Sequence, residues 1–108
     1  MAQNFRRYTY NDVGTSAQTL FTADSYDTVV GISVANITGS AVNASVYIND
    51  GANDIYLIKD APIPTGSALQ VLDGGAKVVV QANDVLKVKS DTASSLDVWV
   101  SAVDAIST

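Results

Sequence analysis

The sequence predicts an all-β fold, an antiparallel β-sandwich of the jelly-roll or immunoglobulin-like type, with about eight or nine short strands. Three observations predict it. Strong helix formers are scarce, since Glu is absent and every acidic residue is Asp, while β-branched and turn-forming residues dominate. Clusters of turn-forming residues recur about every eight to twelve residues. Several of the runs between these clusters alternate apolar with polar side chains.

The turn clusters are rich in Asn, Asp, Gly and Ser, which favour turns because they tolerate or stabilise sharp backbone bends. They span residues 11–16, 24–27, 36–40, 49–54, 60–67, 73–75, 81–84 and 90–95. No stretch repeats its apolar residues at the helical period over a useful length, so we expect no helix longer than one turn.

The first three strands are expected at residues 5–10, 17–23 and 28–36. Alternation is partial in the first two runs and clear in the third. Successive side chains of a strand point to opposite faces of the sheet, so alternation shows which face is buried. The side chains of the third run that are expected to face the core are Val30, Ile32 and Val34.

The next two strands are expected at residues 41–48 and 55–59. Pro62 and Pro64 follow them, and proline has no backbone N–H to donate to a neighbouring strand, so these residues fit a loop or a sheet edge. We expect residues 61–66 to carry the chain from one sheet to the other. The core-facing side chains of the first of these two strands are Val42, Ala44, Val46 and Ile48.

The last four strands are expected at residues 68–72, 77–81, 85–90 and 96–103, of which the final two alternate most clearly. Their core-facing side chains are Leu86, Val88, Leu96, Val98, Val100 and Ala102.

The chain length of 108 residues suits one domain, and no linker, repeat or low-complexity tract divides the sequence. We expect residues 1–12 to form an N-terminal arm or a first strand, and residues 13–108 to form a single β-sandwich domain.

The net charge is −5, and the lysines stand singly among acidic neighbours. Such a surface repels phosphate backbones, so nucleic acid is not an expected partner. No stretch approaches the roughly 20 apolar residues of a membrane helix, and the polar N-terminal segment has no apolar signal core. We therefore expect no membrane contact and no cleaved secretion signal.

The sequence contains no His and no Cys, so it lacks the commonest general base, the commonest zinc ligand and the usual nucleophile pairs. Its Asp residues are spread through turns. We expect no enzyme, no catalytic residue, no cofactor and no metal. Residues 49–54 carry oxygen ligands and a glycine, as calcium loops do, but lack the bidentate Glu of an EF-hand. A hairpin turn explains this cluster equally well, and we favour it.

Trp99 is the first candidate contact residue. Because Val98 and Val100 are expected to face the core, Trp99 should lie exposed on the outer face. Tyr47 occupies the equivalent outer position in its own strand. Large exposed aromatic side chains are enriched in interface cores. A bulge in the strand, or a loop or N-terminal arm over this face, would cover the ring instead.

A short basic and aromatic segment near the N-terminus is the second candidate. It is either a solvated first strand or mobile terminus, or an arm that docks on an acidic neighbouring subunit. The candidate interface residues are Arg6, Arg7, Tyr8, Tyr10, Tyr47 and Trp99.

Five segments carry a resemblance to a known group, namely residues 35–42, 46–48, 63–69, 84–90 and 96–104. Taken together along the chain, they are similar to four successive motifs of small structural proteins of tailed bacteriophages, the decoration, head-fibre, neck and tail accessory proteins. These motifs are an N-T-S strand, a P-x-G turn, a G-D-x-L-x-V hairpin and a closing V-x-V-x-V strand. Asn83 stands where the group usually has Gly, and Asn tolerates the left-handed turn.

The resemblance implies a capsid decoration or cement protein of the virion, assembled in the host cytoplasm. Its implied partners are sister subunits, commonly in a homo-oligomeric trimer, and a major capsid protein or a neck or tail protein. A neck, tail or fibre accessory protein is the first alternative. A carbohydrate-binding β-sandwich module, which would present Trp99 or Tyr47 to a sugar, is the second.

Overall fold

The computed structural model describes residues 4–23, 27–72 and 78–104, which form nine strands and no helix. Each run expected to be a strand overlaps one of the nine. The expected turn at 73–75 and residues 24–26 of the expected turn at 24–27 lie outside the described residues, whereas Asp27 of that turn begins a strand. The strands are β1 (Asn4–Val13), β2 (Gln18–Thr22), β3 (Asp27–Asn36), β4 (Val42–Asn49), β5 (Asp54–Ile63), β6 (Ala68–Gln70), β7 (Val78–Val80), β8 (Val85–Ser90) and β9 (Leu96–Asp104).

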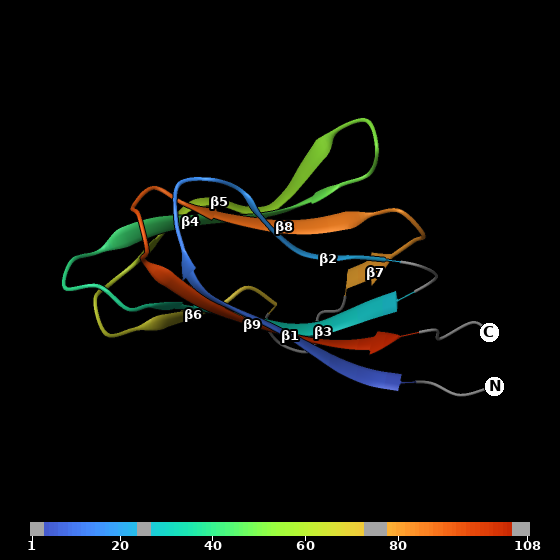
Figure 1. Ribbon diagram of the computed structural model, residues 1–108, viewed down its shortest axis with the longest axis horizontal. Helices are drawn as coiled ribbons and strands as arrows, with labels where there is room; N and C mark the ends of the chain where they lie inside the picture. The colour runs from blue at the N-terminus through green and yellow to red at the C-terminus, as the bar shows by residue number, and fades with distance from the viewer. Residues whose placement is uncertain (1–3, 24–26, 73–77, 105–108) are drawn as a thin grey trace.

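The strands form two antiparallel sheets, one with the order β1-β9-β3-β6, in which β7 also pairs with β3, and one with the order β2-β8-β4-β5 (Figure 1). The pairs are nested along the chain, since β4 pairs with β5, β3 with β6, β2 with β8 and β1 with β9. A long hairpin rolled up in this way is a jelly roll. The sequence did not distinguish a jelly-roll from an immunoglobulin-like sandwich, and the strand order shows that the fold is a jelly roll.

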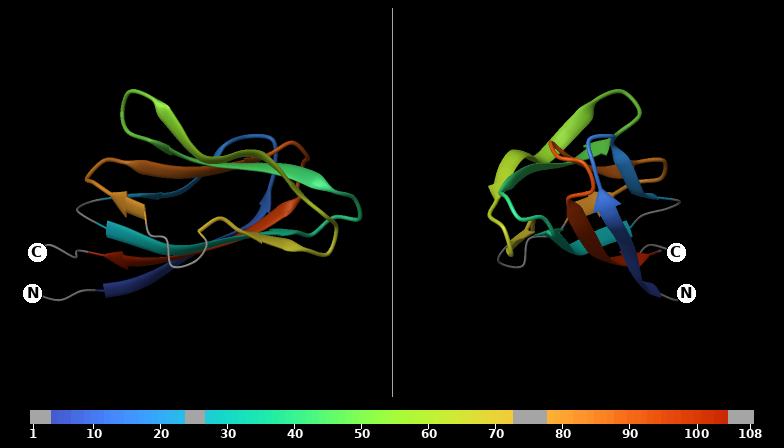
Figure 2. Two further views of the ribbon diagram at one scale, coloured as in Figure 1. Left: turned by 180° about the vertical axis from the view of Figure 1, so that it is seen from behind. Right: turned by 60° about the vertical axis from the view of Figure 1, so that its left-hand side comes forward.

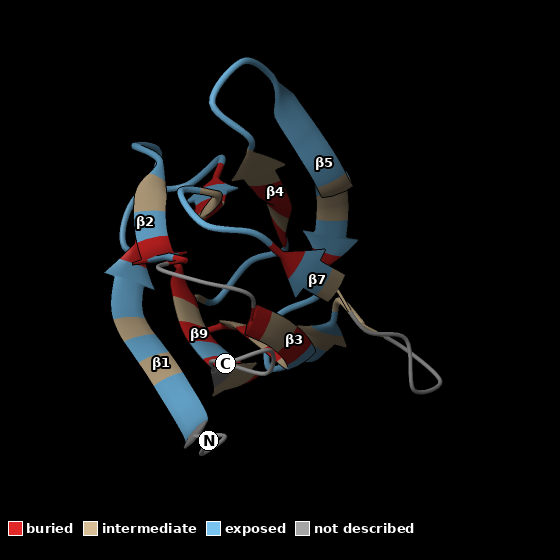
Figure 3. Cartoon of the chain, turned by 90° about the vertical axis from the view of Figure 1, so that its right-hand side faces the viewer, coloured by how far each residue is buried: buried red, intermediate tan, exposed pale blue. Residues whose placement is uncertain are grey.

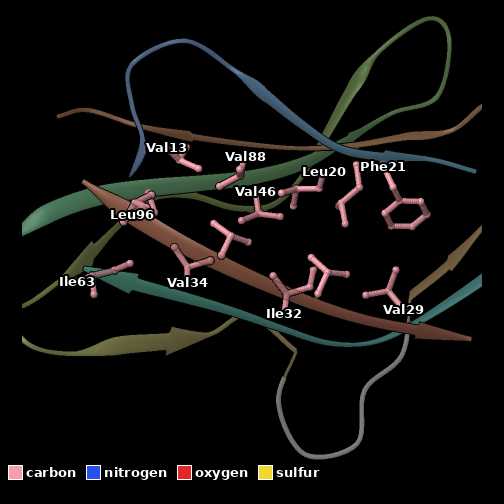
Figure 4. Close-up of a cluster of buried hydrophobic side chains, with 14 of the residues drawn as sticks. Val13, Leu20, Phe21, Val29, Ile32, Val34, Val46, Ile63, Val88 and Leu96 are labelled. Carbon is pink, nitrogen blue, oxygen red and sulfur yellow. The ribbon is translucent and has the colours of Figure 1, made fainter. Parts of the chain in front are cut away.

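The core lies between the inner faces of the two sheets, which form opposed layers in both views of Figure 2. Alternate side chains of the central strands point into this space and interdigitate (Figure 4). The largest fully buried apolar side chains are those of Leu20, Val29, Ile32, Val34, Val46, Ile63, Val80, Leu86, Val88, Leu96 and Val100. Figure 3 shows that the edge strands β1 and β5 are mostly exposed.

The prolines lie at positions where no neighbouring strand needs a hydrogen bond from their backbone nitrogen. Pro62 belongs to β5, the edge strand of its sheet, where it lies opposite Asn43, and Pro64 follows the strand. The segment after β5 leads to β6 in the other sheet, as predicted.

One expected core position is wrong. The register of β3 against β9 shifts between Val29 and Gly31, which marks a bulge. A bulge inserts one extra residue and so moves the alternation by one position. Val29 is consequently fully buried, whereas Val30 is 41% exposed.

Tyr47 also differs from the expectation, because it is only 7% exposed although it lies on the outer side of β4. It pairs in register with Tyr56 of the edge strand β5, and the two ring centroids lie 4.9 Å apart. The ring of Tyr56 therefore helps to cover Tyr47, which the alternation within β4 alone could not show.

Asn36 joins the two sheets at the end of β3. Its Nδ2 donates to the backbone oxygens of Ser40 at 2.8 Å and Ile63 at 2.9 Å. Its Oδ1 accepts from the backbone N–H of Thr38 at 2.9 Å and from the hydroxyl of Thr38 at 2.8 Å. The buried amide thus uses both its donors and both its acceptor positions. Because Ile63 ends β5 in the opposite sheet, this side chain ties the layers together.

Candidate contact surface

The candidate site is the outer surface of β1, β9 and β3, here named the Trp99 face. Within β9, Val98 and Val100 point into the core, so Trp99 between them points outward and is 52% exposed, as predicted. The register sets Trp99 beside Thr9 of β1 and Ser33 of β3. The face comprises Arg7, Thr9, Ser33, Ala35, Asp97, Trp99 and Ser101.

Two neighbours orient the Trp99 ring on the sheet. The guanidinium carbon of Arg7 lies 5.7 Å from the ring centroid, within the range of a cation–π contact. The indole Nε1 donates to the hydroxyl of Ser101 at 3.3 Å. A long hydrogen bond of 3.5 Å from Arg7 Nη1 to the Thr9 hydroxyl adds a second contact for the guanidinium. The ring therefore leans toward the Arg7 end of the face.

The two ends of the Trp99 face carry opposite charges. Arg7 lies opposite Ser101 at one end, and Asp97 lies opposite Ala35 at the other. Asp97 accepts a hydrogen bond of 3.3 Å from the backbone N–H of Asp12. Neither Arg7 nor Asp97 has an ion-pair partner within the part of the chain that the structure describes. Both charges are therefore available to a second molecule.

A groove of about 530 Å³ runs beside Trp99 toward Asp97. Its small side chains, Ser33 and Ala35, lie on the middle strand β3. This volume falls within the range of small-ligand sites and also accommodates a side chain from a partner. The residues that line it are Thr9, Tyr10, Asn11, Ser33, Ala35, Asp97, Val98 and Trp99.

Apolar surface continues at the far end of the same sheet. The register aligns Phe5 of β1 with Val103 of β9, Thr28 of β3 and Val79 of β7 in one row. Phe5 is 83% exposed and Val79 is 63% exposed. Exposed apolar groups that gather on one face of a protein mark interaction surfaces.

The six candidate interface residues do not all lie on one surface of the structure. Arg7 and Trp99 come together on the Trp99 face. Tyr8 and Tyr10 alternate to the inner side of β1 and pack against the core, and Arg6 is exposed in the same strand. Tyr47 lies in the other sheet.

Phe5 and Asp97 are members of this surface that sequence reasoning did not select. Phe5 shares its side of β1 with Arg7, and Asp97 shares its side of β9 with Trp99, so the local alternation contained the signal. What the sequence could not show was that β1 pairs with β9 and so brings the two sets together.

The polar segment between β4 and β5 forms a hairpin turn, as favoured above. The Asp50 carboxylate accepts backbone hydrogen bonds from Asn53 at 2.8 Å and Ala52 at 3.0 Å, which lower the pKa of Asp50. The Asn49 amide donates to the Asp54 carboxylate at 2.7 Å. These side-chain oxygens stabilise the turn itself.

The described residues contain no group of three or more His, Cys, Asp or Glu side chains placed to hold a metal ion. No helix among the described residues has the length and apolar character to cross a membrane.

No protein-family model matches the sequence, and no curated protein matches it. Solved structures do share its fold. A Bacillus endospore appendage protein from a family of disulfide-linked pili superposes with a TM-score of 0.56 and 14% identity, over 94% of this chain and 84% of that protein. This chain has no cysteine, so it cannot form such disulfide links.

The second similar protein is a pentameric capsid protein isolated from metagenomic phage sequences. Its two crystal structures each superpose with a TM-score of 0.53 and 18% identity over 94% of this chain. The chain spans 60% of the capsid protein in one structure and 62% in the other. At these identities the similarity shows the fold alone.

Proposed function

We propose that the protein is a non-enzymatic structural protein of a bacteriophage virion, a capsid decoration or cement protein that binds the shell and sister subunits. The observation that carries the proposal is the half-exposed Trp99 on a sheet face that also exposes Phe5 and Val79. Aromatic residues of this kind anchor protein interfaces. The fold shared with a pentameric phage capsid protein supports the same role.

Self-association through the Trp99 face is the part of the proposal that the structure addresses most directly. Trp99 is the central residue of this face, and Arg7 lies at one end of it, whereas Arg6 alternates to the other side of β1. The sequence resemblance implies a trimer, while the capsid neighbour is pentameric, so the number of subunits is to be measured. A neck, tail or fibre position would use the same contact.

The test measures molar mass by light scattering over a range of protein concentrations. The wild-type protein should form a homo-oligomer, and Trp99→Ala should weaken it. Ile55→Ala is the matched control, because Ile55 is 53% exposed but lies on the other sheet. A wild-type protein that stays monomeric, and that is absent from purified phage particles, would contradict the proposal. Its position in a particle reconstruction would separate shell from neck and tail.

The groove beside Trp99 supports a second candidate, binding of neutral carbohydrate. A sugar ring could stack on Trp99 while the polar groups of Asn11 and Asp97 hydrogen-bond to its hydroxyls. Titration of Trp99 fluorescence with oligosaccharides tests this candidate, with Trp99→Ala as the control in a parallel calorimetric titration. Saturable binding by the monomer would favour the carbohydrate module, and burial of Trp99 in an oligomer would count against it.

A further inference from the structure

We infer that two copies of this chain pair face to face through the Trp99 face, around a two-fold axis that passes beside Trp99 and runs across the strands. The inference rests on the proposed self-association and goes beyond it, because it specifies the contacting residues and the symmetry of the contact. It does not depend on a position in a virion.

The charge pattern of the face sets the direction of the axis. Ser101, which lies opposite Arg7, and Asp97 are separated on β9 by about 13 Å at roughly 3.3 Å per residue, with Trp99 midway between them. An axis across the strands reverses the strand direction in the second copy. Arg7 of each copy then lies level with Asp97 of the other, so the same ion pair forms twice. This reciprocity is the mark of an isologous contact.

A two-fold axis along the strands would not match the charges. Such an axis keeps each residue at its own level, so Arg7 would face the second copy's residues at the level of Ser101 and Gly31. Those residues are neutral, and Asp97 would likewise lie far from Arg7. Because only the axis across the strands brings the two unpaired charges together, the charges favour it.

The shape of the face also suits a second sheet. Many residues on the outer side of β3 and β9 have small side chains or none, namely Gly31, Ser33, Ala35 and Ser101. A facing sheet can therefore approach to the usual distance of about 10 Å. The groove beside Trp99 provides space for the second copy's indole ring. Aromatic pairs prefer an offset arrangement, which two rings on either side of an axis adopt readily.

The face is large enough for a modest dimer. The three long strands β1, β9 and β3 have nine or ten residues each, and β6 and β7 have three each. At about 4.8 Å between strands and roughly 3.3 Å per residue, they cover about 550 Å² before side-chain relief is counted. A standard protein interface buries about 800 Å² on each partner. The protruding Phe5 and Val79 add apolar area at the end of the face.

The experiment uses charge reversal at the two residues. Arg7→Asp and Asp97→Arg each create like charges across the axis, so each should raise the dimer dissociation constant at least tenfold in sedimentation equilibrium. An equimolar mixture of the two variants has complementary charges at both contacts and should associate as a heterodimer. The double variant should also regain association. Lys89→Asp, on the other sheet, should leave the dissociation constant unchanged.

Circular dichroism spectra and thermal melting confirm that each variant is folded, and rescue by mixing excludes a folding defect as the cause. An oligomeric wild type whose mass is insensitive to both reversals, or variants that the mixture does not rescue, would overturn the two-fold contact and leave the proposed self-association standing. A strictly monomeric wild type would overturn both.

Discussion

The rings of Tyr8 and Phe21 stack with their centroids 4.6 Å apart and their planes within 8° of parallel. Tyr8 lies in β1 at the edge of one sheet, and Phe21 lies in β2 at the edge of the other. The stack therefore closes one open side of the sandwich. It also explains why Tyr8, which the basic and aromatic segment suggested as a contact residue, points inward.

Replacing Tyr8 with Ala should destabilise the fold, because it removes the stacked ring and uncovers Phe21, which is 7% exposed. We expect the free energy of unfolding to fall by about 2–3 kcal/mol, less than for a fully buried aromatic residue. Urea denaturation followed by circular dichroism measures it. Thr9→Ala, one residue along on the outer face, should change stability little. If Tyr8→Ala instead dissociated the oligomer at unchanged stability, Tyr8 would be an interface residue.

Valines of the central strands should be far more sensitive than valines of the surface. Val46 and Val98 are buried between the sheets, whereas Val79 is 63% exposed. Truncating either buried valine to Ala should lower the free energy of unfolding by about 1–3 kcal/mol through lost burial and a small cavity. Val79→Ala should change it by about 0.5 kcal/mol or less. Equal losses at the three positions would contradict the assigned core.

The strands could be found from the sequence because several of them alternate with a period of two and turn-forming clusters separate them, and both signals are local. The exposure of Val30 could not be predicted from the alternation within its own strand. The run through Ile32 and Val34 gives no sign of the extra residue at the bulge, which becomes visible only against the register of β9. Tyr47 shows a second kind of failure, since the burial of an outer position depends on what the neighbouring strand places over it.

In the candidate site too, features set by a single strand could be predicted, and features set by the pairing of strands could not. The outward direction of Trp99 was predictable from its own strand. Its contact with Arg7 was not, because it requires the first and last strands to pair, and no feature of either strand specifies that partner. The jelly-roll order depends on the nesting of such remote pairs, so the sequence left it open.

Asn36 should be among the most sensitive polar residues of the chain. Asn36→Ala removes the amide donor of the Ile63 carbonyl oxygen, a buried hydrogen bond, whereas the exposed Ser40 carbonyl keeps the Thr38 hydroxyl as a donor. We expect a loss of about 2–4 kcal/mol in the free energy of unfolding. Asn53→Ala, in the exposed hairpin turn, is the matched control and should have little effect. A small effect at both positions would show that the tie between the sheets adds no stability.

Tyr47 should make the stability of the protein fall at alkaline pH. Its pKa is raised above the ordinary value of 10.0, first because burial disfavours the phenolate and then because Asp54 and Tyr56 lie nearby. The unfolded chain therefore releases this proton at a lower pH than the folded chain. The contribution of the neutral phenol is complete below about pH 10 and is lost as pH rises through the folded-state pKa.

The measurement compares the free energy of unfolding of the wild type and Tyr47→Phe at about pH 8 and about pH 11, by urea denaturation. Phe cannot ionise, so the variant should lose less stability over this range than the wild type. The remaining side chains are the same in both proteins, so the difference between them reports Tyr47 together with its coupling to Tyr56. Parallel losses in the two proteins would mean that Tyr47 ionises as readily in the folded state as in the unfolded chain, and that the cover provided by Tyr56 does not exclude water from its hydroxyl.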